Sequence, residues 1–454
     1  MIPGALEGVR VLDNGIVQAG TLPARLLADF GAEVVRVENY LNPDRPRTMV
    51  YPDGRAREPF WENGGTYHEQ HRNKAFCIGL DVHKATGREA FLRLAAVSDI
   101  VLDSHPPGVL DRLGLGYPQL RVRRPDVIYV TTSGYGIGGP LSSLRSYGTM
   151  TEIMCGSGWL NGYPGEGPRR GGCPLTDHPS TYHAAFAMMA ALIHRDRTGH
   201  GTWLDISQYE IGTTLMGDAI TANSAGVDVP VRVGSVDPDG VFSGCFECEG
   251  EGQWVTISAS GEAAVRTLSS IAGGPDERSN LAERVALWTR TRGKHEAAET
   301  LARAGVAAAP VNDPRDLLLD EHLAARGAFW LVDHAPEQNV GRRAWPAASA
   351  RLSATPGELR TRAPMLGEHN RLIALELLGF TSEEYEAAAA EGAFGTRPAT
   401  ADTRPPDADV LGRVAAGSAR EVDTRNTERL RARFGDDYGY AGNHETVSRK
   451  ESAL

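Results

Sequence analysis

The chain has 454 residues, of which 41% are hydrophobic and 52 are glycine. This length is too great for one core of ordinary size, so we expect two domains of a globular enzyme. The formal net charge of −11 argues against binding to a nucleic-acid backbone as the main task, because proteins with that task present a basic surface.

The N-terminal 15 residues lack the basic segment and apolar stretch of a secretory signal. No apolar run is long enough to span a bilayer, so no membrane partner is expected. The composition therefore predicts a cytoplasmic protein.

The first predicted elements form a βαβ unit, in which the apolar pattern changes from strand to helix and back. We expect Thr21 to cap the helix at its start and Gly31 to follow its end. The predicted order is a strand at 9–12, a loop at 14–20, a helix at 22–30 and a strand at 33–38.

Further strands at 100–102 and 127–131, with helices near 86–97 and 109–113, extend this pattern. It predicts an α/β fold with a Rossmann-like parallel sheet covered by helices. An NAD enzyme is disfavoured, because Gly15 to Gly20 contains no G-x-G-x-x-G, and no P-loop motif occurs.

Composition also predicts the division of the chain into domains. Residues 1–225 form the first part of a large α/β domain, 226–320 form a small α+β domain, and 321–395 return to the large domain. Residues 396–454 are polar and poor in large apolar groups, which is typical of a disordered tail or of an arm on another surface.

The five scattered cysteines fit reduced thiols. Cys245 and Cys248 form a lone C-x-x-C in a segment of predicted strands, without the second ligand pair of a zinc site or the strand-to-helix setting of a redox motif. His178 and His183 likewise lack a third ligand in sequence. We therefore expect no metal site.

Asp177 is the strongest candidate for a catalytic group. It precedes an apolar helix, 184–193, which we expect to be buried on all faces, and Pro179 suits the first helical turn. Backbone N–H groups and the helix dipole keep a carboxylate ionised at this position, where it can attack an activated acyl group. The alternative is that Asp177 is only the helix N-cap.

An ordered set of motifs resembles the family III CoA-transferases, also called the CaiB/BaiF family, from Leu6 to about Phe394. The motifs are LEGVRVLD (6–13), VQAG (17–20), LLADFGAEVVRVE (26–38), RNK (72–74), SGYGIGGP (133–140), RTGHGTWLDIS (197–207), AAPVND (308–313), HLAARGAF (322–329) and APMLGEHN (363–370).

The resemblance implies CoA transfer between an acyl-CoA and a carboxylic acid, with coenzyme A as co-substrate. The residue that matches Asp177 attacks the thioester to give a mixed anhydride, and CoA thiolate then forms an aspartyl-CoA thioester. Gln18 matches a position that lines the acyl site; its alternative role is a loop residue that caps the next helix. The positions matched to CoA binding are Val17, Arg36, Arg72, Lys74 and His105.

The matched basic residues could also be solvated charges. The segment from Ser104 to Gly108 reads S-H-P-P-G where many members have N-F-R-P-G, so contacts to adenine differ. Related racemases pair the aspartate with a histidine in G-H-D, whereas this chain has Ser146, Tyr147 and Gly148 there. Tyrosine, with a pKa near ~10, is a poor proton exchanger at neutral pH.

Two alternatives to CoA transfer remain: a racemase-type acyl-CoA isomerase, and a catalytically silent subunit paired with an active paralogue. The resemblance also implies an interlinked ring-shaped homodimer, and a heteromer with a paralogue is the other arrangement considered. The expected small-molecule partners are acyl-CoA and a small carboxylic acid.

Overall fold

A computed structural model describes residues 3–229, 231–236, 241–273, 281–401, 423 and 425–439. Its contacts divide the chain into two compact units. The first unit consists of Met1–Thr151, Pro174–Ile211 and Glu321–Leu454, and the second consists of Glu152–Cys173 and Gly212–Asp320. Two excursions of the chain therefore build the second unit, and the first unit contains both chain ends.

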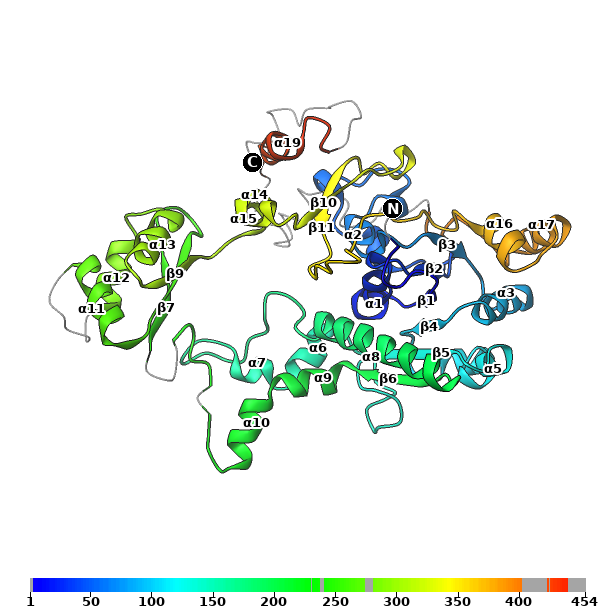
Figure 1. Cartoon of the computed structure of the whole chain (residues 1–454), viewed down its shortest axis with the longest axis horizontal. Coiled ribbons are helices and arrows are strands. Elements are labelled where there is room, and N and C mark those ends of the chain that lie inside the picture. Colours follow the sequence, from blue (N-terminus) through cyan, green and yellow to red (C-terminus); the bar gives the residue numbers. More distant parts are fainter. Residues whose placement is uncertain are drawn as a thin grey trace. The chain divides into compact units, whose positions relative to one another are not determined.

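A six-stranded parallel sheet forms the centre of the first unit, in the order β3-β2-β1-β4-β5-β6 (Figure 1). The order reverses between β1 and β4, which makes their carboxyl ends the topological switch point of a Rossmann-like fold. The strands are β1 (Arg10–Asn14), β2 (Glu33–Glu38), β3 (Phe76–Gly79), β4 (Ile100–Asp103), β5 (Ile128–Ser133) and β6 (Trp203–Ser207).

Helices cover both faces of this sheet, because apolar residues alternate between the two sides of each strand. Val11 packs with α1 (Val17–Asp29) and α8 (Asp177–Thr198), whereas Leu12 packs on the opposite face with α3 (Ala85–Ala96). The α/β prediction is thus confirmed.

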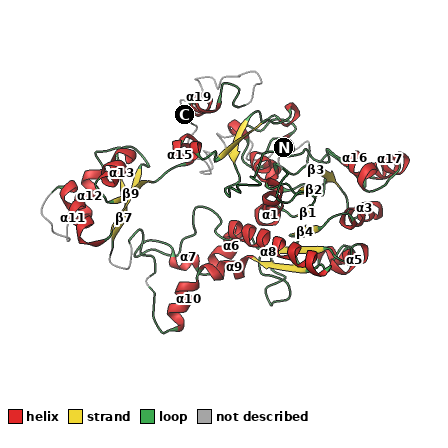
Figure 2. Ribbon diagram, in the orientation of Figure 1, coloured by secondary structure: helices red, strands yellow, loops and turns green. Residues whose placement is uncertain are grey.

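Shorter helices connect these elements, and Figure 2 shows them in red. They are α2 (Gly65–His71), α4 (Val109–Arg112), α5 (Tyr117–Arg123), α6 (Gly148–Met154), α7 (Ser157–Leu160), α9 (Gln208–Leu215) and α10 (Gly217–Ser224).

The predicted start of the first helix is wrong. Helix α1 begins at Val17, so residues 17–20 are helical, and Thr21 lies inside the helix, where its hydroxyl donates to Asp13 Oδ2 at 2.7 Å. The sequence predicts a loop at 14–20 instead. A Cβ at Gly20 would lie 2.0 Å from Ser104 Oγ, so this glycine permits a close helix–loop contact.

Helix α8 also differs from its prediction. Its buried side includes Ala184, Met188 and Leu192. The opposite side exposes four large apolar side chains: Tyr182 (56% exposed), Phe186 (71%), Met189 (41%) and Ile193 (53%). Their spacing of four, three and four residues aligns them on one helix face, so the expectation of burial on all faces is wrong within a single chain.

The chain beyond Glu321 belongs to the first unit. Ile373, Phe380 and Phe394 join the core on the α3 face of the sheet. The elements here are α15 (Glu321–Ala325), β10 (Phe329–Val332), β11 (Arg343–Pro346), α16 (Asn370–Leu372) and α17 (Ser382–Glu391), with β10 and β11 antiparallel.

The second unit is α+β. An antiparallel sheet in the order β7-β8-β9 packs against helices around a core that includes Ile257, Leu268 and Leu301. Its elements are β7 (Phe242–Glu247), β8 (Trp254–Ala259), α11 (Gly261–Ala272), α12 (Leu281–Thr289), α13 (Lys294–Arg303), β9 (Ala307–Pro310) and α14 (Pro314–Leu319).

Most of the predicted polar tail lies outside the described residues. The described part contains α19 (Asn426–Phe434), whose Leu430 is buried. Its Phe434 ring meets Phe329 at a centroid distance of 6.5 Å, so this part of the tail contacts β10. Among the described residues, no helix combines the length and the hydropathy needed to cross a membrane.

Candidate active site

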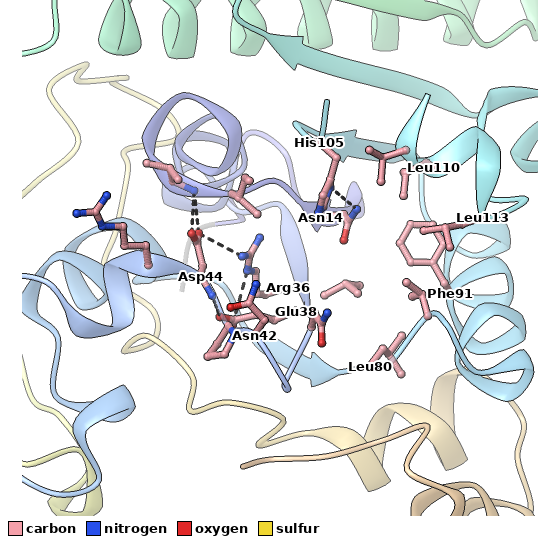
Figure 3. A pocket seen from close by; sticks show the side chains of 18 of the residues that line it. Asn14, Arg36, Glu38, Asn42, Asp44, Leu80, Phe91, His105, Leu110 and Leu113 are labelled. Atoms are coloured by element: carbon pink, nitrogen blue, oxygen red, sulfur yellow. Dashed lines mark hydrogen bonds and ion pairs between the residues drawn. The ribbon is translucent and has the colours of Figure 1, made fainter. Parts of the chain in front are cut away.

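A cavity of about 550 Å³ opens at the carboxyl ends of β1, β2 and β4, at the switch point of the sheet (Figure 3). This is where open α/β sheets bind ligands, and the volume is that of a small-molecule site. Figure 3 shows Arg36, Glu38 and Asp44 on one side and an apolar group on the other. The apolar group includes Leu80, Phe91, Leu110 and Leu113.

A buried ionic network forms the polar wall. The Arg36 guanidinium donates to the Gly15 carbonyl and lies 3.6 Å from Asp13 and 3.4 Å from Asp44. Burial opposes the charge, but these carboxylates outweigh it and raise the Arg36 pKa. The alternative that Arg36 is a solvated surface charge is therefore wrong, since its side chain is 1% exposed.

Asp44 joins this network to the start of α1. The Val17 N–H donates to both Asp44 oxygens, at 3.1 and 2.8 Å. Burial raises the Asp44 pKa to about 6, and the Arg36 charge works against this rise. A carboxylate therefore occupies the positive end of α1, beside the cavity.

His105 also lines the cavity, two residues after the end of β4. Its Nδ1 lies 2.7 Å from Asp103 Oδ1 and 3.3 Å from Asn14 Nδ2. Burial disfavours the charged ring, but the bond to Asp103 prevails and raises the His105 pKa above 6.5. The ring is thus oriented by Asp103 and carries positive charge more readily than a free histidine.

Asp177 is the first residue of α8 and is 8% exposed. The helix N-cap is Thr176, whose side chain makes no capping hydrogen bond, so the alternative that Asp177 is the N-cap is wrong. The side-chain amide of Gln208 donates to Asp177 Oδ1 at 2.7 Å. Gln208 begins α9 directly after β6, so the end of the sheet positions this amide.

Gly148 lies against the same carboxylate. A Cβ at this position would stand 2.5 Å from both Asp177 oxygens, which no side chain can do without displacing the carboxylate. The hydroxyls of Thr151 and Thr176 donate to the Gly148 carbonyl, at 3.0 and 3.1 Å, and fix this approach. We call Gly148, Thr151, Thr176 and Gln208 the Asp177 seat.

Tyr147 connects the seat to the cavity along the chain. It lines the cavity, and the next residue is Gly148. One peptide bond therefore separates the cavity wall from the residue in contact with the Asp177 carboxylate. Sequence reasoning considered Tyr147 and Gly148 only as departures from a racemase pattern.

The remaining predicted residues have varied positions. Val17 lines the cavity, with a left-handed φ of 55°. Gln18 follows it in the first turn of α1 and is half-buried, so it is not a loop residue. Its predicted role at the acyl site stays a prediction.

Arg72 and Lys74 are buried and are not among the cavity-lining residues. Arg72 pairs with Asp29 at 3.3 Å, and Lys74 Nζ lies 2.7 Å from Asp13 Oδ2. The alternative that these two residues are solvated charges is therefore wrong. Contact with CoA phosphates stays a prediction for these two residues.

Gln208 was missed by sequence reasoning. Its one signal is its place directly after strand β6, which was not among the predicted strands, at an edge where parallel sheets present functional groups. None of the five cysteines forms a disulfide. Cys245 is exposed on strand β7, and Cys248 is buried. Within the described ranges, no three His, Cys, Asp or Glu side chains form a group that could hold a metal ion.

Comparison with known proteins identifies the class of enzyme. The pattern of CoA-transferase family III matches residues 6–370, so the chain belongs to this family. A crystal structure of a CaiB/BaiF family protein from Brucella suis has the same fold, with a TM-score of 0.73 and 26% identity over 83% of this chain and all of that one (100%).

Four relatives that are named as CoA-transferases or as subunits of one are similar to most of this chain. Probable CoA-transferase Rv1866 of Mycobacterium tuberculosis is 31% identical over 84% of this chain, which spans 49% of that protein's length. Succinyl-CoA–D-citramalate CoA-transferase of Chloroflexus aurantiacus is 30% identical over 84% of this chain and 96% of its own length. The alpha and beta subunits of a succinyl-CoA–L-malate CoA-transferase from the same species are 28% and 29% identical over 84% of this chain. The chain is thus a CoA-transferase by family.

Proposed function

We propose that the chain moves CoA from an acyl-CoA to a carboxylic acid through a covalent intermediate on Asp177. The observation that carries this proposal is a nearly buried carboxylate at the start of α8, seated against Gly148 and Gln208 beside the cavity wall. The helix dipole favours the ionised form that attack requires.

The chemistry proceeds by two exchanges at the same side chain. An Asp177 oxygen attacks the thioester carbon and expels CoA thiolate, which leaves a mixed anhydride. The thiolate then attacks Asp177 Cγ, releases the donor acid and forms an aspartyl-CoA thioester. The acceptor carboxylate attacks this thioester at Cγ and expels CoA thiolate, which leaves a second mixed anhydride. The thiolate then attacks the acceptor acyl carbon of that anhydride, forms the new acyl-CoA and restores the Asp177 carboxylate.

CoA is proposed to bind in the switch-point cavity. Its apolar wall suits the pantetheine chain, and His105 supplies positive charge for anionic groups, whereas Arg36 is already paired with Asp13 and Asp44. Val17, at the start of α1, lies on the same wall.

For the acids, the names of the relatives favour short dicarboxylates. We propose succinyl-CoA as donor and D-citramalate or L-malate as acceptor, and these form the first panel to test. Because two relatives are named as alpha and beta subunits, a heteromer with a paralogue is the alternative to a homodimer.

The racemase alternative finds less support. Gly148 leaves room for the Asp177 carboxylate in a space that the side chain of the racemase aspartate would fill. Incubating an α-methylacyl-CoA in deuterated water decides the matter: α-proton exchange without any acceptor acid would support the racemase.

Trapping tests the covalent route. With succinyl-CoA present and no acceptor, the enzyme should stall as an adduct, and hydroxylamine should then modify one aspartate in the peptide around Asp177. A silent subunit forms no such adduct. Robust transfer without any label would point to direct exchange and would remove Asp177 from the nucleophile role.

We further propose that the chain forms a homodimer through the apolar stripe of α8. Tyr182, Phe186, Met189 and Ile193 expose four large side chains on one helix face, and soluble proteins usually bury such a patch against a partner. Light scattering should give twice the chain mass of 48.8 kDa. Phe186→Asp should yield monomer, whereas Val122→Asp, at a position 82% exposed on α5, should not.

A further inference from the structure

We propose that Gln208 is a catalytic residue: its side-chain amide stabilises the negative charge that develops on Asp177 Oδ1 when CoA thiolate attacks the aspartyl carbon. This inference rests on the proposed function, because it assigns a role within the same covalent cycle. It names a donor for the aspartyl half of the reaction, in which the enzyme's own side chain is the acyl group.

The geometry carries the first step of the argument. Gln208 Nε2 lies 2.7 Å from Oδ1, a short and strong contact for an amide donor to a carboxylate. Gln208 is 7% exposed and Asp177 is 8% exposed, so little water competes for this bond. In such a site a donor is worth more than in water.

The backbone holds this donor in place. Ser207, the last residue of β6, pairs in register with Ser133 of β5, and the Tyr209 N–H donates to the Gly134 carbonyl at 2.9 Å. Both neighbours of Gln208 are therefore attached to the end of β5. The amide is organised before the substrate arrives, which is the requirement for charge stabilisation without reorganisation.

Chemistry gives the bond its function. The oxygen that Gln208 does not hold attacks the thioester and becomes the bridging oxygen of the anhydride. Oδ1 then becomes the aspartyl carbonyl oxygen. When thiolate adds to Cγ, the electron pair of the carbonyl moves onto Oδ1, beside the Gln208 N–H. The pair returns as the bond from Cγ to the bridging oxygen breaks, and the donor acid leaves as its carboxylate.

The first attack needs Gln208 less than the later ones do. In that step, negative charge leaves Asp177 and develops on the donor carbonyl oxygen. In the steps at Cγ, negative charge returns to Oδ1. Loss of the amide should therefore slow turnover at the anhydride, before the thioester forms.

The test compares Gln208→Leu with wild type and with Gln119→Leu, the same change at an exposed position on α5. With the succinyl-CoA and acceptor pair found in the panel, we expect Gln208→Leu to lower kcat by about 10²-fold and to change the donor KM by less than about 3-fold. Gln119→Leu should match wild type in both constants.

Intact-protein mass spectrometry gives a measurement that would not change if Gln208 had only a structural role. After an acid quench with donor alone, wild type should carry mainly the mass of CoA, as the thioester, whereas Gln208→Leu should carry mainly the succinyl mass, as the anhydride. Gln208→Glu keeps the size of the side chain. It should be less active than Gln208→Leu at pH 8 and should gain activity as the pH falls, because only a protonated carboxyl can donate to Oδ1.

The outcomes separate this inference from the function on which it rests. Equal adducts and a near-normal kcat in Gln208→Leu, with Asp177→Asn inactive, would overturn the role of Gln208 alone. Wild type without adducts, or Asp177→Asn at the parental rate, would overturn the aspartyl route and this inference together.

Discussion

Buried carboxylates occur in two settings near the same cavity, the ionic network and the Asp177 seat, and their hydrogen-bond partners differ. In the ionic network, Glu38 bonds to the Arg47 guanidinium at 2.9 Å, and Asp13 bonds to the Lys74 ammonium at 2.7 Å. In the Asp177 seat, the carboxylate accepts a hydrogen bond from the neutral amide of Gln208.

This difference has chemical consequences. A cation at hydrogen-bond distance neutralises a carboxylate and makes it a poor nucleophile, whereas a neutral amide orients the oxygen and leaves its charge in place. Glu38 shows the first effect: burial raises its pKa, but Arg47 and Arg36 lower it further than burial raises it. Burial is thus common to both settings, and the proposed nucleophile differs from Glu38 in accepting a hydrogen bond from a neutral amide.

The largest expected effect tests the seat directly. We expect Asp177→Asn to lower the rate of CoA transfer by about 10⁴-fold or more, because an amide of the same size cannot attack the thioester. Chromatography of the acyl-CoA products measures the rate. Asp196→Asn is the matched control, since Asp196 lies on the same helix and is 72% exposed. Transfer by the Asp177 variant at the parental rate would show that this carboxylate is structural.

The next effect belongs to the network. Lys74 is fully buried, and burial lowers its pKa to about 8 although the Asp13 charge opposes this change. Removing one member of a buried pair leaves an uncompensated charge, so Lys74→Met should lower the free energy of unfolding by about 3 kcal/mol. Denaturant unfolding measures the loss.

The same variant tests the prediction from sequence that Lys74 meets a CoA phosphate. In that case Lys74→Met would raise the KM for acyl-CoA. With a thioester of 3′-dephospho-CoA the increase would vanish for a contact to the 3′-phosphate and persist for a contact to the pyrophosphate. A loss of stability with an unchanged KM assigns Lys74 to the network.

A smaller effect returns to the seat. A methyl group at Gly148 would stand 2.5 Å from both Asp177 oxygens, so Gly148→Ala must displace the carboxylate. A displacement of about 1 Å costs about 10²-fold in rate, and we expect that loss in kcat. Gly139→Ala is the control, because a Cβ there meets no atom within 4 Å. A normal kcat in Gly148→Ala would mean that the seat tolerates a shifted carboxylate.

Much of the fold could be predicted from the sequence, because local patterns determine it. The strand at Glu33–Glu38 was predicted with its observed bounds from its apolar run alone. The start of α1 could not be predicted, since the local pattern favours a loop at 14–20, whereas the close approach of Gly20 to Ser104 depends on another segment of the chain. The exposed side of α8 was missed because a wholly apolar helix predicts burial without specifying the partner.

The candidate site shows the same limit. Asp177 can be proposed from local sequence, because the start of an apolar helix favours an ionised carboxylate, and its catalytic role stays a prediction. The contacts of Gln208 and Gly148 with Asp177 could not be predicted, because these residues lie 31 and 29 residues away along the chain and only the fold brings them together. A residue that acts by contacting another residue distant in sequence produces no local sequence pattern.

The smallest expected effect is a pH dependence in the network, and it concerns Asp44. Its pKa is raised to about 6 in the folded chain, first of all by burial, whereas an unfolded aspartate titrates near its ordinary value of 3.8. Between these pH values the folded state holds more protons than the unfolded state. Asp44 therefore contributes stability that is full below about pH 4 and is lost as the pH rises through about 6.

Asp44→Asn should remove this dependence, because an amide does not titrate. We expect the variant to lose about 2 kcal/mol less than wild type in free energy of unfolding between pH 4 and pH 6.5, as urea titrations at several pH values can measure. Asp53→Asn is the control with the opposite sign: burial raises the Asp53 pKa, but Arg343 and Arg57 lower it further, so Asp53 stabilises the fold at higher pH. Equal pH profiles for wild type and Asp44→Asn would mean that Arg36 keeps Asp44 ionised throughout. The network would then hold its charges as firmly at pH 4 as at pH 7, and the wall of the cavity would not respond to protons.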